Sequence, residues 1–396
     1  MTTQEYINLE NEHGAHNYHP IDVVIKEAKG AWVTDVEGKK YLDFLSAYSA
    51  VNQGHCHPKV KAAMLEQIDK ITLISRAFRN SVLPMFFKKM YELTGYEMTL
   101  AMNSGAEGVE SAIKLARAWG YKEKKVPLNK AEIIVATGNF HGRTTTIVGF
   151  SDDPMSYQTF GPYAEGAFPK HEYGNLDDLK SKITANTVGI LVEPIQGEGG
   201  VVIPPDGYLK GIEEICKKNN ILFICDEIQS ALGRAGKLFA HQWEGVRPDI
   251  VILGKALSAG FYPISAVLAD KPIMLSIQPG QHGSTFGGNP VAAAVAIRAL
   301  EVLEEENLIE RSLELGNYFM DKLRAIKNDK IEFIRGRGLW IGLGLNCMAR
   351  PICEKLQKLG MLCKDTHKTI IRLAPPLIIT KEELDLAINK LEEALK

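Results

Sequence analysis

The chain has 396 residues, of which 45% are hydrophobic and 24% are charged, and its formal net charge is −2. This composition is ordinary for a globular protein, and the length favours two or three domains with an ample core. So small a net charge gives no basic field for nucleic acid or an anionic membrane surface. No apolar run approaches the roughly 20 residues of a membrane span, so we expect no nucleic-acid and no membrane partner.

The N-terminal segment and the cysteines indicate a cytoplasmic protein. The first twenty residues are polar and acidic, without the pattern of a secretory signal or a transit peptide. Six cysteines are scattered with no C-x-x-C pair, which favours reduced thiols over a disulfide framework or a zinc site. His13, His16 and His19 are evenly spaced, but Asn, Gly and Pro interrupt the segment, and we predict no metal.

The first elements in chain order form an arm and a hairpin. We expect residues 1–45 to be an N-terminal arm followed by a hairpin over residues 31–44, with its turn at Gly38. Helical spacing of apolar residues follows at 58–70 and again at 81–93.

Residues 46–288 read as a large α/β domain. Short apolar runs alternate with helical stretches, and this order predicts a mostly parallel sheet. The predicted strands are 98–102, 133–136, 188–192, 221–225, 250–253 and 264–268. From residue 289 the pattern changes to long helices followed by short strands, which predicts a second, smaller α+β domain over 289–396.

Two of the predicted strands, Ile221–Cys225 and Ile250–Leu253, are followed by chemically informative residues. Asp226 follows the first strand, and Gly254 and Lys255 follow the second. Ligands of α/β sheets bind beyond such strand ends. Pyridoxal phosphate (PLP) needs this pair, because a lysine forms its Schiff base and a carboxylate partners its pyridinium nitrogen. Taken singly, Asp226 could be a helix N-cap and Lys255 a solvated loop lysine.

Other predicted strands end in loops of small and polar residues. Residues 103–106 open a helix, where free N–H groups and the helix dipole favour an anion. After residue 136, Phe140 could stack on a ring and Arg143 could grip a carboxylate. The ordinary alternatives are an N-cap, a core phenylalanine and a surface arginine. Glycine-rich segments at 193–200 and 280–290 carry further polar residues.

Together these motifs resemble the class III aminotransferases, PLP-dependent enzymes of fold type I. The resemblance runs from about residue 14 to the C-terminus and includes MNSGAEGVESAIKLAR, GNFHGRT, VEPIQGEGG, ICDEIQSALGRAGKLFA, ILGKALSAG, HGSTFGGNP and RLAPPL. Within the class, GAHNYHP and SAYSAVNQGHCHP are similar to segments of the ornithine δ-aminotransferases. The resemblance implies a large PLP-binding domain, a smaller C-terminal domain and a homodimer with shared active sites.

The resemblance also implies roles for the residues that match its motifs. Lys255 would form the Schiff base and shuttle the proton, and Asp226 would keep the ring nitrogen protonated. The remaining cofactor contacts would be Gln229 at the ring hydroxyl, Phe140 and Ile228 on the two ring faces, and, at the phosphate, Ser104, Gly105, Ala106 and Thr285, the last reaching the phosphate bound by the partner subunit.

A second implied set of residues would choose the substrate. Tyr18 and Arg143 would hold the α-carboxylate and α-amino end of ornithine, which leaves the δ-amine at the cofactor. Arg372 would bind the α-carboxylate of glutamate or 2-oxoglutarate. Glu198 would pair with Arg372 when ornithine is bound, and Tyr48 would help to set this switch.

These roles predict a ping-pong transfer of the δ-amino group of L-ornithine to 2-oxoglutarate. The products would be glutamate and glutamate 5-semialdehyde, which cyclises to pyrroline-5-carboxylate. The main alternative is an aminotransferase for acetylornithine or another ω-amino acid. A PLP-dependent mutase, which needs no external oxo-acid, and a non-catalytic PLP-fold module are more remote, since one fold hosts many functions.

Overall fold

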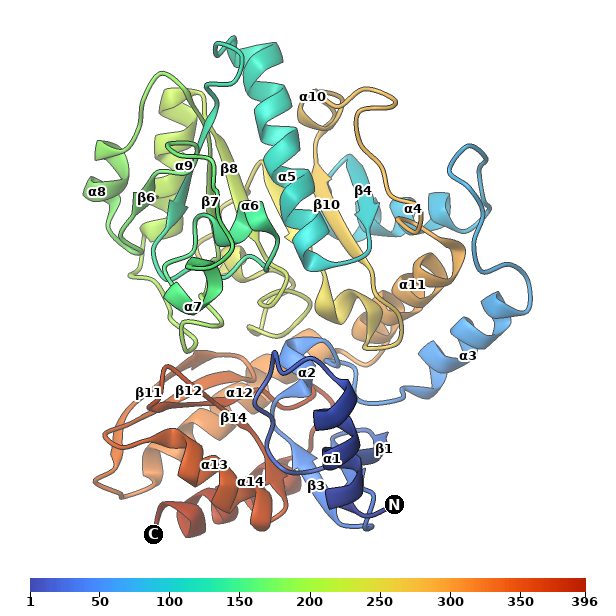
Figure 1. The fold of residues 1–396 in the computed structure, drawn as a ribbon, viewed down its shortest axis with the longest axis vertical. Helices are drawn as coiled ribbons and strands as arrows, with labels where there is room; N and C mark the ends of the chain where they lie inside the picture. Colours follow the sequence, from blue (N-terminus) through green and yellow to red (C-terminus); the bar gives the residue numbers. More distant parts are fainter.

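Short apolar strands between residues 98 and 269 form the sheet at the centre of the larger lobe, and amphipathic helices from the same part of the chain flank it (Figure 1). The structure is a computed structural model that describes residues 1–396. The sheet has seven strands in the order β4-β10-β9-β8-β7-β5-β6. Their bounds are β4 (Met98–Met102), β5 (Glu132–Ala136), β6 (Lys170–His171), β7 (Thr187–Val192), β8 (Leu222–Asp226), β9 (Ile250–Leu253) and β10 (Ser265–Ala269). Neighbours are parallel except β10, which is antiparallel to β4 and β9, so the predicted mostly parallel α/β sheet is confirmed.

The middle of this sheet is buried on both faces, which explains why its strands are continuous apolar runs. Every residue of β7, β8, β9 and β10 is buried. Because successive side chains point to opposite faces, Ile133 packs in the core cluster of α5 (Gly105–Trp119), whereas Ile134 packs in that of α9 (Tyr208–Asn219). Helices thus cover both faces, and the ends of the strands remain for a ligand.

The helices expected at 58–70 and 81–93 are confirmed as α3 (Pro58–Ile68) and α4 (Leu83–Thr94). The other helical segments of this part of the chain are short: α2 (Ser46–Ser49), η1 (Gly120–Lys124), α6 (Thr145–Val148), α7 (Pro154–Tyr157), α8 (Leu176–Ser181), η2 (Ala240–Trp243), η3 (Lys255–Ser258) and α10 (Lys271–Met274).

The smaller lobe combines the two ends of the chain (Figure 1). The predicted hairpin is confirmed as β2 (Trp32–Asp35) and β3 (Lys40–Asp43). The structure adds β1 (Ile25–Lys29) on one side and the parallel strand β13 (Met361–Leu362) on the other. The second sheet of the lobe has the order β11-β12-β15-β14, with bounds Ile331–Arg337, Trp340–Leu345, Ile370–Leu373 and Lys364–Thr366. Its helices are α12 (Leu308–Ala325), α13 (Ala349–Lys358) and α14 (Lys381–Leu395).

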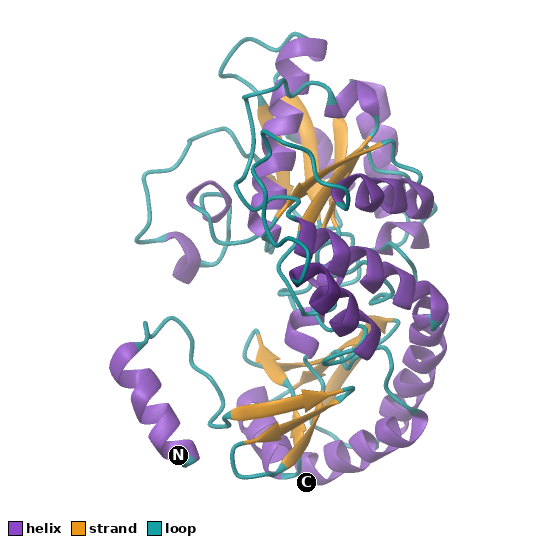
Figure 2. Cartoon of the chain, turned by 90° about the vertical axis from the view of Figure 1, so that its right-hand side faces the viewer, coloured by secondary structure: helices purple, strands orange, loops and turns teal.

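The pairing of β13 with β3 attaches the N-terminal hairpin to the C-terminal part of the chain. The division into 1–45, 46–288 and 289–396 stays a prediction. The first helix, α1 (Thr3–His13), has no buried residue and lies to one side of the sheets of the smaller lobe (Figure 2). No helix of the structure combines the length and the apolar character needed to cross a membrane.

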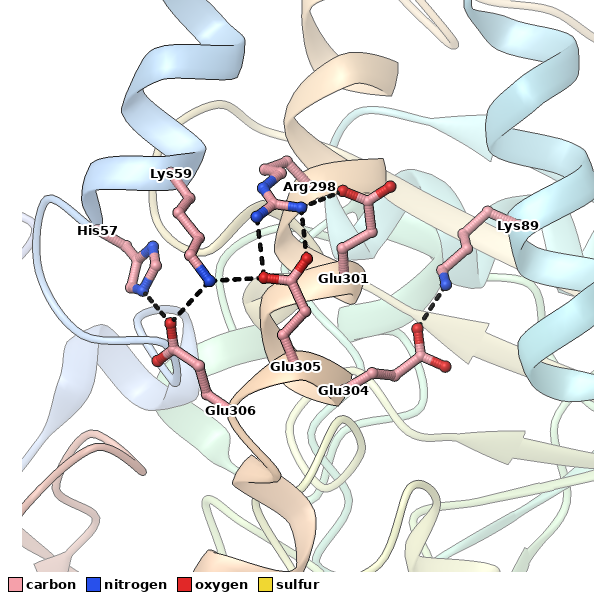
Figure 3. Close-up of polar contacts among 8 residues, drawn as sticks. All are labelled: His57, Lys59, Lys89, Arg298, Glu301, Glu304, Glu305 and Glu306. Atoms are coloured by element: carbon pink, nitrogen blue, oxygen red, sulfur yellow. Dashed lines mark hydrogen bonds and ion pairs between the residues drawn. The ribbon is translucent and has the colours of Figure 1, made fainter.

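A network of ion pairs fastens α3 and α4 to the C-terminal half of α11 (Pro290–Glu305), as Figure 3 shows. Lys59 Nζ donates to Glu305 Oε2 over 2.6 Å, and Arg298 Nη2 donates to the same oxygen over 2.9 Å. The remaining members are His57, Lys89, Glu301, Glu304 and Glu306. Partly exposed pairs contribute little stability one by one, so the network mainly fixes the orientation of the three helices.

Candidate active site

A cavity opens at the carboxyl ends of β8 and β9, where the sequence predicts the cofactor site. It brings together most of the predicted cofactor residues, namely Gly105, Ala106, Phe140, Asp226, Ile228, Gln229 and Lys255. These residues come from four separate segments of the chain, and the parallel sheet gathers them because its strand ends meet at one edge.

Asp226 ends β8 and is 5% exposed. Its Oδ1 accepts a hydrogen bond from the backbone N–H of Ile228 over 3.0 Å, and its Oδ2 lies 2.7 Å from His141 Nδ1. A short turn follows the strand, and no helix begins there, so the N-cap alternative is wrong. The carboxylate is held from two sides and lines the cavity.

His141 is a functional candidate that the sequence did not single out. The ring is buried, and its Nε2 has no hydrogen-bond partner. Burial alone would lower the pKa of His141, but the hydrogen bond and the charge of Asp226 outweigh it and raise that pKa above its usual value. The only signal in the sequence was its place in the loop that also carries Phe140.

Lys255 begins η3 directly after β9 and has a positive φ of 42°. Burial disfavours the charged form of its amine and lowers its pKa from 10.5 to about 8, although the negative charge of Glu198 opposes this. The amine is therefore no solvated loop lysine. A primary amine with this pKa is partly neutral at physiological pH and can act as a nucleophile or a base.

Gln229 links Lys255 to the arginine of the substrate set. With the amide oriented as its neighbours require, Oε1 accepts from Lys255 Nζ over 2.9 Å and from Arg372 Nη2 over 3.0 Å. The facing residue is Gly197, where a Cβ atom would lie 1.5 Å from the other polar atom of the Gln229 side-chain amide. Only glycine leaves room for the amide at this position.

Glu193 fastens the loop of Phe140 to the loop after β7. Its Oε2 accepts from the N–H of Phe140 over 2.9 Å, and its Oε1 accepts from the N–H of Gly197 over 3.3 Å. Burial raises the pKa of this carboxyl to about 7. These two bonds place the Phe140 ring at the cavity wall.

Arg372, Glu198 and Tyr48 meet beside Gln229. Arg372 in β15 is 1% exposed, and its Nη1 donates to Glu198 Oε1 over 2.7 Å. Burial alone would raise the pKa of Glu198, but the charge and hydrogen bond of Arg372 lower it. The Arg372 guanidinium also lies 5.4 Å from the centre of the Tyr48 ring, within cation–π range. The structure thus brings together three of the five predicted substrate residues.

Tyr48 reaches this position from a left-handed turn. Ser46, Ala47, Tyr48 and Ser49 have φ values of 50°, 46°, 58° and 71°. A residue with a Cβ atom pays roughly 1–2 kcal/mol for this conformation, so four in succession store considerable strain. Such strain persists only where the surroundings impose it, and it is concentrated at functional sites.

The N-terminus of α5 forms the other end of the cavity. Ser104 is its N-cap, in a capping box with Glu107, and Gly105 and Ala106 present the first free N–H groups. A Cβ atom at Gly105 would lie 3.0 Å from Ile228 Cδ1, and one at Gly142 would lie 2.9 Å from Ala106 Cβ. Small residues therefore keep this helix end open to an anion.

Tyr18, Arg143 and Thr285 neither line the cavity nor belong to the cluster of Arg372, Glu198 and Tyr48. Tyr18 is 71% exposed, and Thr285 is exposed on the loop before α11. Arg143 is exposed as well; its Nη1 donates to Ser156 Oγ over 3.2 Å and its guanidinium lies 5.6 Å from the Phe140 ring centre.

The residues of this cavity fit PLP. An amine of lowered pKa and a buried carboxylate stand at two strand ends, and a helix N-terminus kept clear by glycines supplies N–H groups for a phosphate. Phe140 and Ile228 supply walls for a flat ring. By contrast, no group of His, Cys, Asp and Glu is arranged to hold a metal ion.

Comparisons with known proteins agree with this site. The family model Aminotransferase class-III matches residues 13–395. An ornithine aminotransferase of Exiguobacterium sp. is 58% identical over 99% of this chain and 98% of its own. Among solved structures, the ornithine aminotransferase of Toxoplasma gondii (42% identity, TM-score 0.98) covers 100% of this chain and 95% of its own. The acetylornithine aminotransferase of Elizabethkingia anophelis (47% identity, TM-score 0.90) covers 100% of this chain and 99% of its own. The chain described here belongs to the class III aminotransferases.

Proposed function

We propose that this enzyme transfers the δ-amino group of L-ornithine to 2-oxoglutarate, giving glutamate 5-semialdehyde and glutamate. The observation that carries the proposal is the ion pair between Arg372 and Glu198 beside Lys255. An arginine covered by a movable carboxylate suits an enzyme that accepts a cationic and a dianionic substrate in turn. The relatives named ornithine aminotransferase support the same substrate.

The chemical step uses the residues of the cavity. When bound, PLP supplies an electron sink that stabilises negative charge on the reacting carbon of the substrate. Asp226, held in place by His141, would pair with the pyridine nitrogen of PLP and favour its protonated form. Lys255 Nζ removes a proton from the substrate carbon and returns it, which its lowered pKa allows near neutral pH. Phe140 and Ile228 limit the access of water from the two sides.

The two substrates place opposite demands on Arg372. With ornithine, a free Arg372 would attract the α-carboxylate and present the wrong amine to Lys255. In the structure Glu198 occupies that guanidinium, so the α-carboxylate is left to Tyr18 and Arg143 in our proposal. With 2-oxoglutarate, Glu198 releases Arg372, which grips the α-carboxylate.

Replacing Glu198 tests this arrangement. We expect Glu198→Ala to lose the preference for the δ-amine of ornithine over the α-amine, because the uncovered Arg372 competes for the α-carboxylate. The ratio of δ- to α-transamination products measures the effect. Asp206 is fully exposed and lies, like Glu198, between β7 and α9, so Asp206→Ala provides the control. An unchanged product ratio in Glu198→Ala would show that Glu198 does not act as the switch.

N-acetylornithine is the second candidate substrate, favoured by the 47% identity to the acetylornithine enzyme. Initial rates with ornithine, N-acetylornithine and 4-aminobutyrate, each with 2-oxoglutarate, separate the candidates. We expect ornithine to give the highest kcat/KM and a product that is trapped as the cyclic imine. Turnover without any oxo-acid would instead indicate a mutase.

We also propose a homodimer with shared active sites, located in the cytoplasm. Large apolar side chains are exposed on α3, on α4, in the segment between them and on the loop of Thr285: Leu65, Ile68, Ile71, Phe78, Met85, Tyr91 and Phe286. A second copy of the chain is the natural cover for such a surface, and it would receive Thr285 at its phosphate. The six free cysteines are typical of a reducing compartment.

A further inference from the structure

The left-handed turn Ser46–Ser49 is stabilised from both ends. Asp43 Oδ1 accepts from the N–H groups of Leu45 and Ser46 over 2.8 and 3.0 Å. The carbonyl of Ser46 then accepts from the N–H of Ala50 over 2.8 Å. Since no glycine eases the backbone here, these contacts are what hold the turn in its unfavourable conformation.

One side chain of the turn reaches across to the strand of Arg372. Ser46 Oγ donates to the carbonyl of Ala374 over 2.7 Å, and both residues are buried. The N–H of Ala374 in turn donates to the carbonyl of Phe44 over 2.8 Å. Ala374 lies two residues beyond Arg372, directly after β15. The segment Phe44–Ser46 and the end of β15 are therefore joined through both backbone polar groups of Ala374.

The second serine of the turn makes no such bond. Ser49 is 1% exposed, like Ser46 at 0%, but its Oγ has no hydrogen-bond partner. The turn therefore contains two buried serine hydroxyls, of which only one connects it to the strand of Arg372.

We propose that Ser46 is a positioning residue for dicarboxylate recognition, acting by holding Tyr48 and Arg372 as one unit. The Tyr48 ring faces the Arg372 guanidinium only while the turn and β15 keep their mutual position, and Ser46 supplies the side-chain bond between them. This inference rests on the proposed function, in which Arg372 binds the α-carboxylate of 2-oxoglutarate.

The test compares Ser46→Ala with Ser49→Ala in the PLP-loaded enzyme. Glutarate, a five-carbon dicarboxylate without a reactive group, is titrated calorimetrically, and KM is measured for both substrates. Loss of one net hydrogen bond should weaken glutarate binding about five-fold in Ser46→Ala. KM for 2-oxoglutarate should rise in parallel, whereas KM for ornithine and the absorbance of bound PLP stay unchanged. Ser49→Ala should match the parent enzyme throughout.

Equal glutarate affinity in the two serine variants would overturn the inference, as would a parallel rise of both KM values with loss of PLP. If Ser46→Ala folds poorly, the double variant Ser46→Ala/Ala47→Gly eases the backbone without restoring the bond, and it should keep the glutarate defect. Arg372→Lys distinguishes a failure of the proposed substrate site from a failure of the role of Ser46. If Arg372→Lys leaves glutarate binding intact, the proposed substrate site fails and the inference with it; if only Ser46→Ala is silent, the inference alone fails.

Discussion

Lys255 shows how a single side chain acquires its chemistry from its surroundings. An ordinary lysine is almost wholly charged at neutral pH and is neither a nucleophile nor a base. Burial at the end of β9 lowers the pKa of Lys255 to about 8, while the nearby carboxylate of Glu198 limits the shift. Near neutral pH, part of the Lys255 amine is therefore neutral and reactive, while the rest stays charged and can attract anionic ligands.

This pKa predicts how cofactor uptake depends on pH. PLP reacts with the neutral amine, so its uptake by the cofactor-free protein should accelerate about ten-fold per pH unit below 8 and level off above it. Stopped-flow absorbance across a pH series measures the rate. Glu198→Gln removes the charge that opposes the effect of burial, so its midpoint should move to lower pH. A midpoint near that of an ordinary lysine in both proteins would contradict the assignment.

His141 marks the limit of what residue types alone can indicate. Its partner Asp226 lies 85 positions away in the chain, and only the packing of the two strand ends brings them within 2.7 Å. Asp226 and Lys255 could be predicted because each lies within two residues of the end of an apolar strand. His141 had no comparable signal, since a histidine in a loop has many uses.

At the scale of elements, the four left-handed residues of α2 are the least expected feature. The sequence Ser-Ala-Tyr-Ser contains no glycine or asparagine, the residues that most often adopt the left-handed conformation. The conformation is imposed by two contacts. One uses the side chain of Asp43, and the other joins Ser46 to Ala374, which is distant in the sequence. Local propensity could not have predicted it.

Relief of this strain gives a stability prediction. Ala47→Gly should raise the free energy of unfolding by about 1 kcal/mol, because glycine adopts positive φ freely. Ala62, exposed within the regular helix α3, allows the same chemical change in an ordinary setting. Ala62→Gly should lower stability by about 1 kcal/mol. Denaturant titrations compare the two, and destabilisation by both would argue against strain at Ala47.

The N-terminus of α5 combines a structural cap with a predicted phosphate contact. Ser104 caps α5 through the same box, with a glutamate three residues on, as Thr380 caps α14. Ser104→Ala and Thr380→Ala should each cost about 1 kcal/mol of stability. Only Ser104→Ala should also weaken PLP binding, as equilibrium dialysis would show. Equal PLP affinity in the two variants would reduce Ser104 to a cap.

Element length decided which parts of the fold could be predicted. The strands β7, β8 and β9 were predictable because burial on both faces demands an unbroken apolar run. β6 and β13 have two residues each, too short for any periodicity. The attachment of the N-terminal hairpin to β13 joins residues more than 300 positions apart and depends on tertiary packing alone.

At the scale of the molecule, cofactor and substrate residues come from different parts of the chain. The cofactor residues that line the cavity all belong to the large lobe, on strand ends and the start of α5. The three predicted substrate residues that meet come from α2, the loop after β7 and β15 of the smaller lobe. If these residues have the roles we propose, the chemistry stays fixed on the sheet, while substrate choice depends on how the lobes meet.

Thr285 completes this division if a second chain supplies it. Within one chain the residue is exposed, and it lies on a loop that Ser284 Oγ anchors by accepting from Asn103 Nδ2 over 2.8 Å. The loop therefore has a defined place from which to reach a neighbouring molecule. Sedimentation should give twice the chain mass of 43.8 kDa.

Mixed dimers test whether the sites are shared. Thr285→Asp places a negative charge near the phosphate and should weaken PLP binding, and Lys255→Ala removes the amine, so each homodimer should be inactive. When both chains are co-expressed, the heterodimer has one site with both defects and one site with none, if Thr285 serves the partner's phosphate. Purified heterodimer should then regain about half of the parent activity and bind one tight PLP per dimer. If Thr285 served its own chain, every site would carry one defect and activity would stay absent.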